Sequence, residues 1–152
     1  MHFSEIVDYA NERFLELSGG RYQFKIQKTK EVGKHGLDIA INDSENGDRA
    51  PETLSGGETF QASISLALAM TDVICQRTGG IRLDSLFIDE GFGSLDQESL
   101  DKAIATLKKI QEQKMVGVIS HVEAMETEIK SHVVVDKGPD DCHSSVRIEN
   151  FE

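Results

Sequence analysis

The sequence lacks several features that would assign it to common protein classes. Its 152 residues contain no apolar run near the roughly 18 to 20 residues needed to cross a bilayer, and no charged-then-apolar leader opens the chain. Its two cysteines, Cys75 and Cys142, lie far apart and outside any metal-ligand spacing. We therefore expect a cytoplasmic globular domain with free thiols rather than a disulfide-bonded or membrane protein.

A Gly-x-x-x-x-Gly-Lys-Ser/Thr loop, which holds the phosphates in many nucleotide-binding proteins, is also missing. The chain also has no excess of positive charge, since its formal net charge is −11. This charge argues against the chain alone being a strong binder of duplex DNA. One stretch, residues 21–35, carries five basic residues against one Glu, a balance of +4. It fits either the solvated face of a hairpin or a minor DNA-facing edge.

The first half of the chain alternates between helical and strand periodicity. Residues 3–17 repeat apolar side chains at spacings of 4, 3, 4 and 3, which fits either a coiled-coil seam or an amphipathic surface helix. Gly19-Gly20 should end that helix. Residues 22–27 and 37–42 alternate as a strand hairpin, and residues 42–53 are expected to form a polar loop. Residues 59–77 are apolar nearly all round, which predicts a helix buried on most of its faces.

The second half predicts a parallel pair of strands. Short buried strands are expected at residues 83–88 and 115–119, with a helix over residues 97–113 between them. Strand, helix and strand in that order imply a crossover and parallel pairing. A short helix near residues 122–129, strands at 133–135 and 145–148, and a turn through 138–140 complete an α/β layout. We expect residues 1–18 to be the end of a coiled-coil arm or a packed helix, and residues 19–152 to form one lobe.

The segment from Leu54 to Glu58 has the character of a helix start. Ser55 and Glu58 have the spacing of a capping box. Capping does not explain Gly56 and Gly57 in the first turn, where each glycine costs about 1 kcal/mol relative to alanine. Two glycines there are consistent with close approach of a ligand, and a helix N-terminus prefers an anion such as a phosphate. The same letters at 17–20 end a helix, so we assign that copy no ligand.

Polar residues follow both strands of the predicted parallel pair. Asp89 and Glu90 come directly after Leu86-Phe87-Ile88, at the carboxyl end where open α/β sheets place ligands. One carboxylate could coordinate Mg²⁺ while the other orients a water molecule, or both could be an acidic strand end. His121 follows the second strand and would share this edge, where it could donate a hydrogen bond to a terminal phosphate or be structural. Asp96 fits either a cap for the next helix or a role in a subunit-spanning loop.

In this order, these residues resemble the carboxyl-terminal half of the ATPase head of the SbcC family of SMC-like ABC ATPases. The segment Leu54 to Glu58 is similar to the ABC signature motif, which we call the signature segment. The segment Leu86 to Glu90 is similar to the Walker B strand, Ser94 to Asp96 to the D-loop, and His121 to the switch histidine. The resemblance implies an ABC-ATPase-type carboxyl-terminal lobe, with a mixed sheet of parallel core strands flanked by helices and an N-terminal hairpin.

The resemblance also implies a division of labour between two heads that close on ATP. Ser55 and Gly57 would touch the γ-phosphate of ATP held mainly by the partner head, within a signature segment that includes Gly56 and Glu58. In its own head's site, Asp89 would help hold Mg²⁺ and Glu90 would polarise the attacking water. His121 would sense the γ-phosphate, and Asp96 would report across the interface.

The partners implied by the resemblance are an amino-terminal Walker A lobe of the same parent chain, a second head in a homodimer, an SbcD-type nuclease and DNA. ATP-driven head dimerisation and hydrolysis would then regulate the nuclease in DNA repair. The missing Walker A loop suggests that this chain is a carboxyl-terminal fragment that is inactive by itself. Two other interpretations are an SMC-type structural clamp that holds DNA and a fragment of an ABC transporter ATPase.

Overall fold

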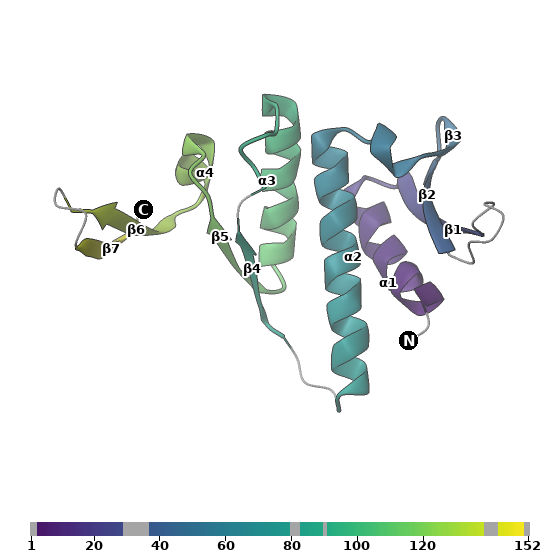
Figure 1. Ribbon diagram of the computed structural model, residues 1–152, viewed down its shortest axis with the longest axis horizontal. Coiled ribbons are helices and arrows are strands. Elements are labelled where there is room, and N and C mark those ends of the chain that lie inside the picture. The colour runs from purple at the N-terminus through teal and green to yellow at the C-terminus, as the bar shows by residue number, and fades with distance from the viewer. Residues whose placement is uncertain (1–2, 29–36, 80–82, 90, 139–142, 151–152) are drawn as a thin grey trace.

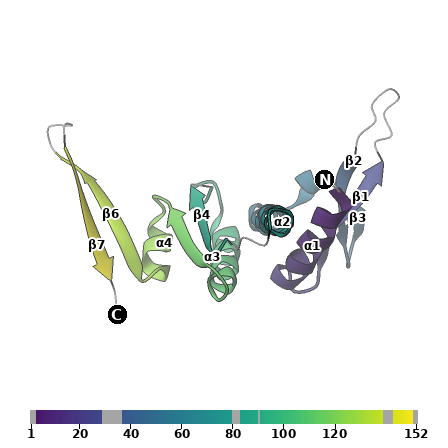
Figure 2. The ribbon, with the colours of Figure 1, turned by 90° about the horizontal axis from the view of Figure 1, so that it is seen from below.

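The elements of the chain lie side by side in a row (Figures 1 and 2). The computed structural model describes residues 3–28, 37–79, 83–89, 91–138 and 143–150. A small sheet covers helix α1, which packs on α2; α2 then packs on α3, and α3 lies next to a pair of parallel strands. Farther along, a short helix and a β-hairpin complete the row (Figure 2). This mixed α/β arrangement agrees with the predicted fold class.

Helix α1 (Phe3–Leu17) buries one apolar stripe within this chain. The buried residues are Ile6, Val7, Ala10 and Phe14. The Phe14 ring stacks on Phe24 and Tyr22 of the adjacent strand, with centroid distances of 4.7 and 5.8 Å. The helix ends as predicted at Gly19 and Gly20, which have φ of 66° and 88°. Its apolar stripe is therefore used for packing against the small sheet and α2.

The small sheet is a hairpin with a third strand added. Strands β1 (Tyr22–Lys28) and β2 (Leu37–Asp43) pair antiparallel, as the alternation predicted. The expected polar loop at 42–53 was wrong in part, because it contains strand β3 (Gly47–Arg49) and the 3₁₀ helix η1 (Pro51–Thr53). Gly47, with φ of 81°, allows the tight turn that returns the chain along β2.

The long helix α2 (Gly56–Arg77) begins at the signature segment. One side packs on α1, where Arg13 and Arg77 form ion pairs with Asp72 and Glu5. Another side packs on α3, where Ile64 and Leu68 are buried against Ile110. Burial on most faces was an overestimate, because Met70 and Ile74 are 43% and 48% exposed.

Strands β4 (Ser85–Asp89) and β5 (Met115–Ile119) pair parallel, with Asp89 opposite Ile119, and α3 (Gln97–Gln111) connects them. This pairing confirms the predicted strand, helix, strand unit. The prediction that both strands are buried was wrong for one face. Phe87, Met115 and Ile119 are 68%, 62% and 56% exposed, because the described helices pack on the opposite face.

The last elements are α4 (Glu123–Glu128) and the antiparallel hairpin of β6 (Ser131–Lys137) and β7 (Ser144–Asn150). They agree with the predicted short helix and two strands, and residues 139–140 of the predicted turn lie outside the described residues. One face of the hairpin is apolar and exposed, through Val133, Val135, Val146 and Ile148. Among the helices that the structure describes, none is long and apolar enough to cross a membrane.

Candidate functional site

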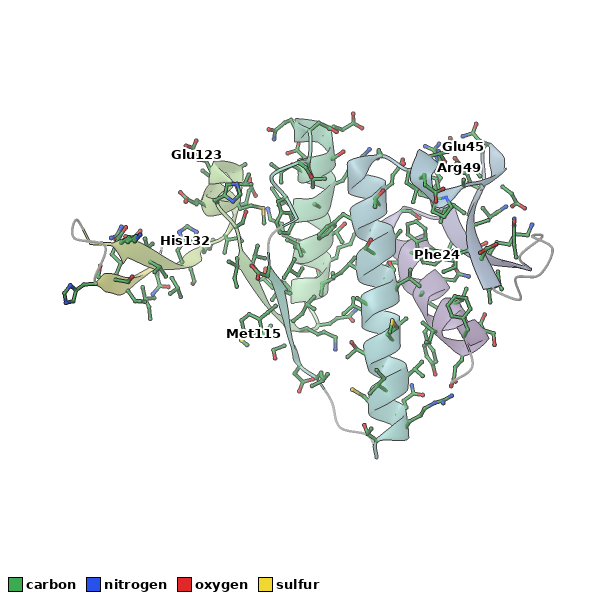
Figure 3. The ribbon with its side chains drawn as sticks, viewed as in Figure 1. Phe24, Glu45, Arg49, Met115, Glu123 and His132 are labelled. Carbon is green, nitrogen blue, oxygen red and sulfur yellow. The ribbon has the colours of Figure 1, made fainter. Side chains whose placement is uncertain are left out.

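The predicted site residues gather at one end of the molecule. The carboxyl ends of β4 and β5 and the first turns of α2 and α3 all lie at the upper end in Figure 1. Met115, at the start of β5, marks the opposite end (Figure 3). This gathering follows from the parallel pairing, because parallel strands present their carboxyl ends at the same edge.

The signature segment forms the predicted capping box at the start of α2. The backbone N–H of Ser55 donates to Oε2 of Glu58 at 2.9 Å, and the Glu58 N–H donates to Oγ of Ser55 at 3.4 Å. Ser55 itself is exposed, whereas the side chain of Glu58 is only 16% exposed. The box therefore fixes the backbone of an accessible serine at the helix N-terminus.

Two residues from the small sheet also contact the carboxylate of Glu58. The Tyr22 hydroxyl donates to Oε1 at 2.7 Å, and Nη2 of Arg49 lies 3.4 Å from Oε2. Burial is the main reason that the pKa of Tyr22 is raised to about 12, and the bond to Glu58 adds to it. Burial opposes ionisation of Glu58, but the hydrogen bonds from Ser55 and Tyr22 outweigh it and lower its pKa.

The glycines of the signature segment pack against α3. A Cβ atom at position 57 would lie 3.0 Å from both Cα and the carbonyl oxygen of Ser99, and one at position 56 would lie 2.8 Å from Cδ2 of Leu95. Helix packing therefore accounts for the missing side chains without a ligand. A phosphate contact at Gly56 and Gly57 stays a prediction. The same packing places the signature segment beside the D-loop of the same chain.

Asp89 is exposed at the end of β4, and Glu90 lies outside the described residues. Magnesium in nucleotide sites is usually held by one or two carboxylates together with phosphate oxygens and water. A single exposed Asp fits that donor set. Within the described ranges, no group of three or more His, Cys, Asp or Glu could hold a metal by itself.

His121 lies at the same edge as Asp89. It follows β5 by two residues, and its ring contacts the loop after β4: a Cβ atom on Gly93 would lie 3.4 Å from Nε2 of His121. Gly91, with φ of 99°, begins that loop in a conformation that favours glycine. The edge prediction for His121 is thus confirmed in position, and its contact with a phosphate stays a prediction.

Asp96 caps α3, one of its two predicted roles. Its Oδ1 accepts from the Ser99 N–H and its Oδ2 from the Ser99 hydroxyl, both at 2.9 Å. These two bonds lower the pKa of Asp96. A role across a subunit interface stays a prediction.

The contribution of Tyr22 and Arg49 could not be found from sequence motifs. They lie 36 and 9 residues before Glu58, and Arg49 belongs to the strand that was expected to be loop (Figure 3). In the basic stretch, Arg21 pairs with Asp43 and Lys25 with Asp48, so these two charges are used within the small sheet. Lys30 and Lys34 of that stretch lie in residues 29–36, outside the described residues.

Two bacterial relatives are similar to most of this chain. One is the SbcC subunit of the SbcCD nuclease from Lactococcus lactis subsp. lactis, which is 47% identical over 140 residues, covering 90% of this chain and 13% of the relative. The protein of the same name from Treponema pallidum is 50% identical over 137 residues, covering 88% of this chain and 13% of the relative. The chain therefore spans about an eighth of the length of these relatives.

Solved structures of SMC ATPase heads share the fold. The "SMC head domain from Thermotoga maritima" matches with a TM-score of 0.65 at 17% identity, covering 99% of this chain and 49% of that chain. A structure titled "Structural biochemistry of ATP-driven dimerization and DNA stimulated activation of SMC ATPases" matches with a TM-score of 0.67 at 19% identity, covering 98% of this chain and 86% of that chain. The family model "SbcC/RAD50-like, Walker B motif" matches residues 20–109. Because that match covers more than half of the sequence, the chain belongs to the SbcC/RAD50-like family.

Proposed function

We propose that this chain is the carboxyl-terminal lobe of an SbcC-like ATPase head, which closes on ATP together with a second head. The observation that carries this proposal is the gathering of the signature segment, the D-loop and the ends of β4 and β5 at one end of a chain of this family. The relatives are named as subunits of the SbcCD nuclease. We therefore propose an SbcD-type nuclease and DNA as partners of the complete protein, with ATP hydrolysis as the regulatory step.

Asp89, Glu90 and His121 have complementary roles in the proposal. Mg²⁺, when bound, would neutralise phosphate charge, and Asp89 is the residue that would help hold it. Glu90 orients and polarises the attacking water. His121 donates a hydrogen bond to the γ-phosphate and so distinguishes bound ATP from its hydrolysis product.

The signature segment acts on the nucleotide of the other head. Ser55 is exposed at a helix N-terminus, where backbone N–H groups and the helix dipole favour an anion. Ser55 and Gly57 contact the γ-phosphate from this side, and Asp96 lies next to them through its bond to Ser99. ATP then joins the two heads, and hydrolysis releases them.

The uncovered strand faces support an amino-terminal lobe as a further partner. Phe87, Met115 and Ile119 form an exposed apolar face on β4 and β5, and the β6–β7 hairpin exposes a second one. Apolar faces of this kind usually mark interaction surfaces. A lobe that carries the Walker A loop and covers these faces would complete both the sheet and the nucleotide site. The 41–50% identity to nuclease subunits favours this assignment over a purely structural clamp or a transporter.

Reconstitution of the head tests the proposal. We expect the chain alone to hydrolyse ATP negligibly and addition of its amino-terminal lobe to restore turnover. In the reconstituted head, Glu90→Gln should lower turnover at least about 100-fold, the usual scale for loss of a general base, while ATP-dependent dimers persist. Ser55→Arg should abolish those dimers by crowding the phosphate. Robust turnover by the chain alone, or normal dimerisation of Ser55→Arg, would contradict the proposal.

A further inference from the structure

The hydroxyl of Tyr22 is buried next to the signature segment. The residue is 3% exposed, and its ring stacks on Phe14 in the core beneath the small sheet. Its hydroxyl donates to Oε1 of Glu58 at 2.7 Å. A buried phenol normally finds a hydrogen-bond partner, and this one is bonded to the glutamate that completes the capping box of α2.

Glu58 collects donors from three parts of the chain. They are Tyr22 on β1, Arg49 on β3 and the backbone N–H of Ser55 before α2. A capping glutamate on an isolated helix can rotate away from the N-cap residue. Here the Tyr22 hydroxyl holds Oε1 of Glu58, so Oε2 stays in place to accept from the Ser55 N–H. The carboxylate therefore links the small sheet to the backbone of the signature serine.

Burial of the phenol and its hydrogen bond to Glu58 keep this linkage intact near neutral pH. They outweigh the guanidinium groups of Arg21 and Arg49, which lie 4.9 and 5.0 Å from the Tyr22 ring centroid and favour the ionised phenol. The pKa of Tyr22 is raised and that of Glu58 is lowered. The phenol therefore remains a donor and the carboxylate an acceptor over the pH range in which ATP hydrolysis is normally assayed.

We infer that Tyr22 is a positioning residue for ATP-dependent head closure, and that it holds Ser55 in place through the carboxylate of Glu58. This inference rests on the proposed function, because the position of Ser55 affects head closure only if that serine contacts a phosphate. The small sheet is thereby a part of the signature site.

The test is Tyr22→Phe in the head reconstituted with its amino-terminal lobe. This change keeps the ring and removes only the hydroxyl. The variant loses a hydrogen bond to a charged carboxylate, which is stronger than one between neutral groups. We therefore expect the ATP concentration for half-maximal dimerisation to rise about tenfold. Turnover at saturating ATP should stay near that of the unmodified head. The matched control is Tyr9→Phe, which removes an exposed hydroxyl bonded to Gln76 and should change neither value.

A second pair of variants separates positioning from simple stability. If Tyr22 acts through Glu58, Tyr22→Phe should have no further effect on the ATP requirement when Glu58 is already alanine. An equal effect in both backgrounds would overturn the inference. So would a variant that melts at a lower temperature while its ATP requirement for dimerisation is unchanged.

The Ser55→Arg head serves as the reference for the proposed function. If Ser55→Arg abolishes dimerisation while Tyr22→Phe behaves like the unmodified head, only the positioning inference fails. If Ser55→Arg dimerises normally, the proposed role of the signature segment fails, whatever Tyr22→Phe does.

Discussion

At the residue scale, Gly57 shows that helix packing alone can require a missing side chain. The first turn of α2 lies so close to α3 that a Cβ atom would meet backbone atoms of Ser99 at 3.0 Å. Backbone atoms cannot rotate away. Gly56 differs, because its nearest neighbour is the end of the flexible Leu95 side chain.

We therefore expect Gly57→Ala to lower the free energy of unfolding by up to about 2 kcal/mol. Overpacking of this kind usually costs about 1 to 3 kcal/mol, and the better helix propensity of alanine returns about 1. Gly56→Ala is the matched control and should be nearly neutral, because Leu95 can move. Urea unfolding of the two variants measures the difference. Equal stabilities would mean that α3 does not require glycine at position 57.

The two glycine pairs also show what local sequence can predict. The pair at 19–20 was correctly predicted to end a helix, because a strand pattern follows it. The capping box was correctly predicted from the spacing of Ser55 and Glu58. The contact between Gly57 and Ser99 joins residues far apart in the chain, and no local pattern contains it. The same is true of the bond between Tyr22 and Glu58.

At the element scale, the turn between β2 and β3 depends on Asp43. This carboxylate is 1% exposed and accepts from both Nε and Nη2 of Arg21 at 3.1 Å, from the Asn46 side chain and from the Glu45 N–H. Strand β3 was missed because its residues, Gly-Asp-Arg, carry no apolar alternation. Its pairing is fixed by the turn, so periodicity alone could not reveal it.

Stability should depend on pH through Asp43. The hydrogen bonds from Arg21 are the largest cause that lowers its pKa; burial opposes them, and Asn46 and the Glu45 N–H assist. A folded-state pKa below the unfolded one gives a contribution that is present above the ordinary value of about 4 and is lost as the pH falls further. We expect Asp43→Asn to destabilise the chain most near neutral pH, with the difference shrinking in acid.

Urea midpoints measured from about pH 7 to about pH 3 would show this trend. Asp38→Asn is the control, because Asp38 is exposed on the same strand and should give a small difference at every pH. A destabilisation by Asp43→Asn that does not change with pH would show that the charge of Asp43 does not hold the turn.

At the scale of the whole molecule, β4 and β5 are apolar on both faces, but the helices pack on one face. Leu86-Phe87-Ile88 and the strand at 115–119 have the near-continuous apolar sequence of parallel strands that are buried on both sides. Within this chain, helices cover Ile88, Val116 and Val118, whereas Phe87 remains 68% exposed. The sequence pattern predicted strand positions and pairing correctly, because these depend on local residues. It could not predict which face this chain leaves open, because that depends on the side on which distant helices pack.

The exposed face leads to a prediction about assembly. Phe87→Lys should weaken binding of the amino-terminal lobe roughly 30-fold, as expected when a central aromatic contact of about 2 kcal/mol is lost from an interface. The unfolding of the chain alone should change little, because the side chain is already mostly in water. Met70→Lys, at a 43% exposed position on α2, is the control and should leave lobe binding intact. Titration calorimetry with the separate lobe distinguishes the two variants. If both variants bind the lobe like the unmodified chain, the lobe does not cover β4 and β5.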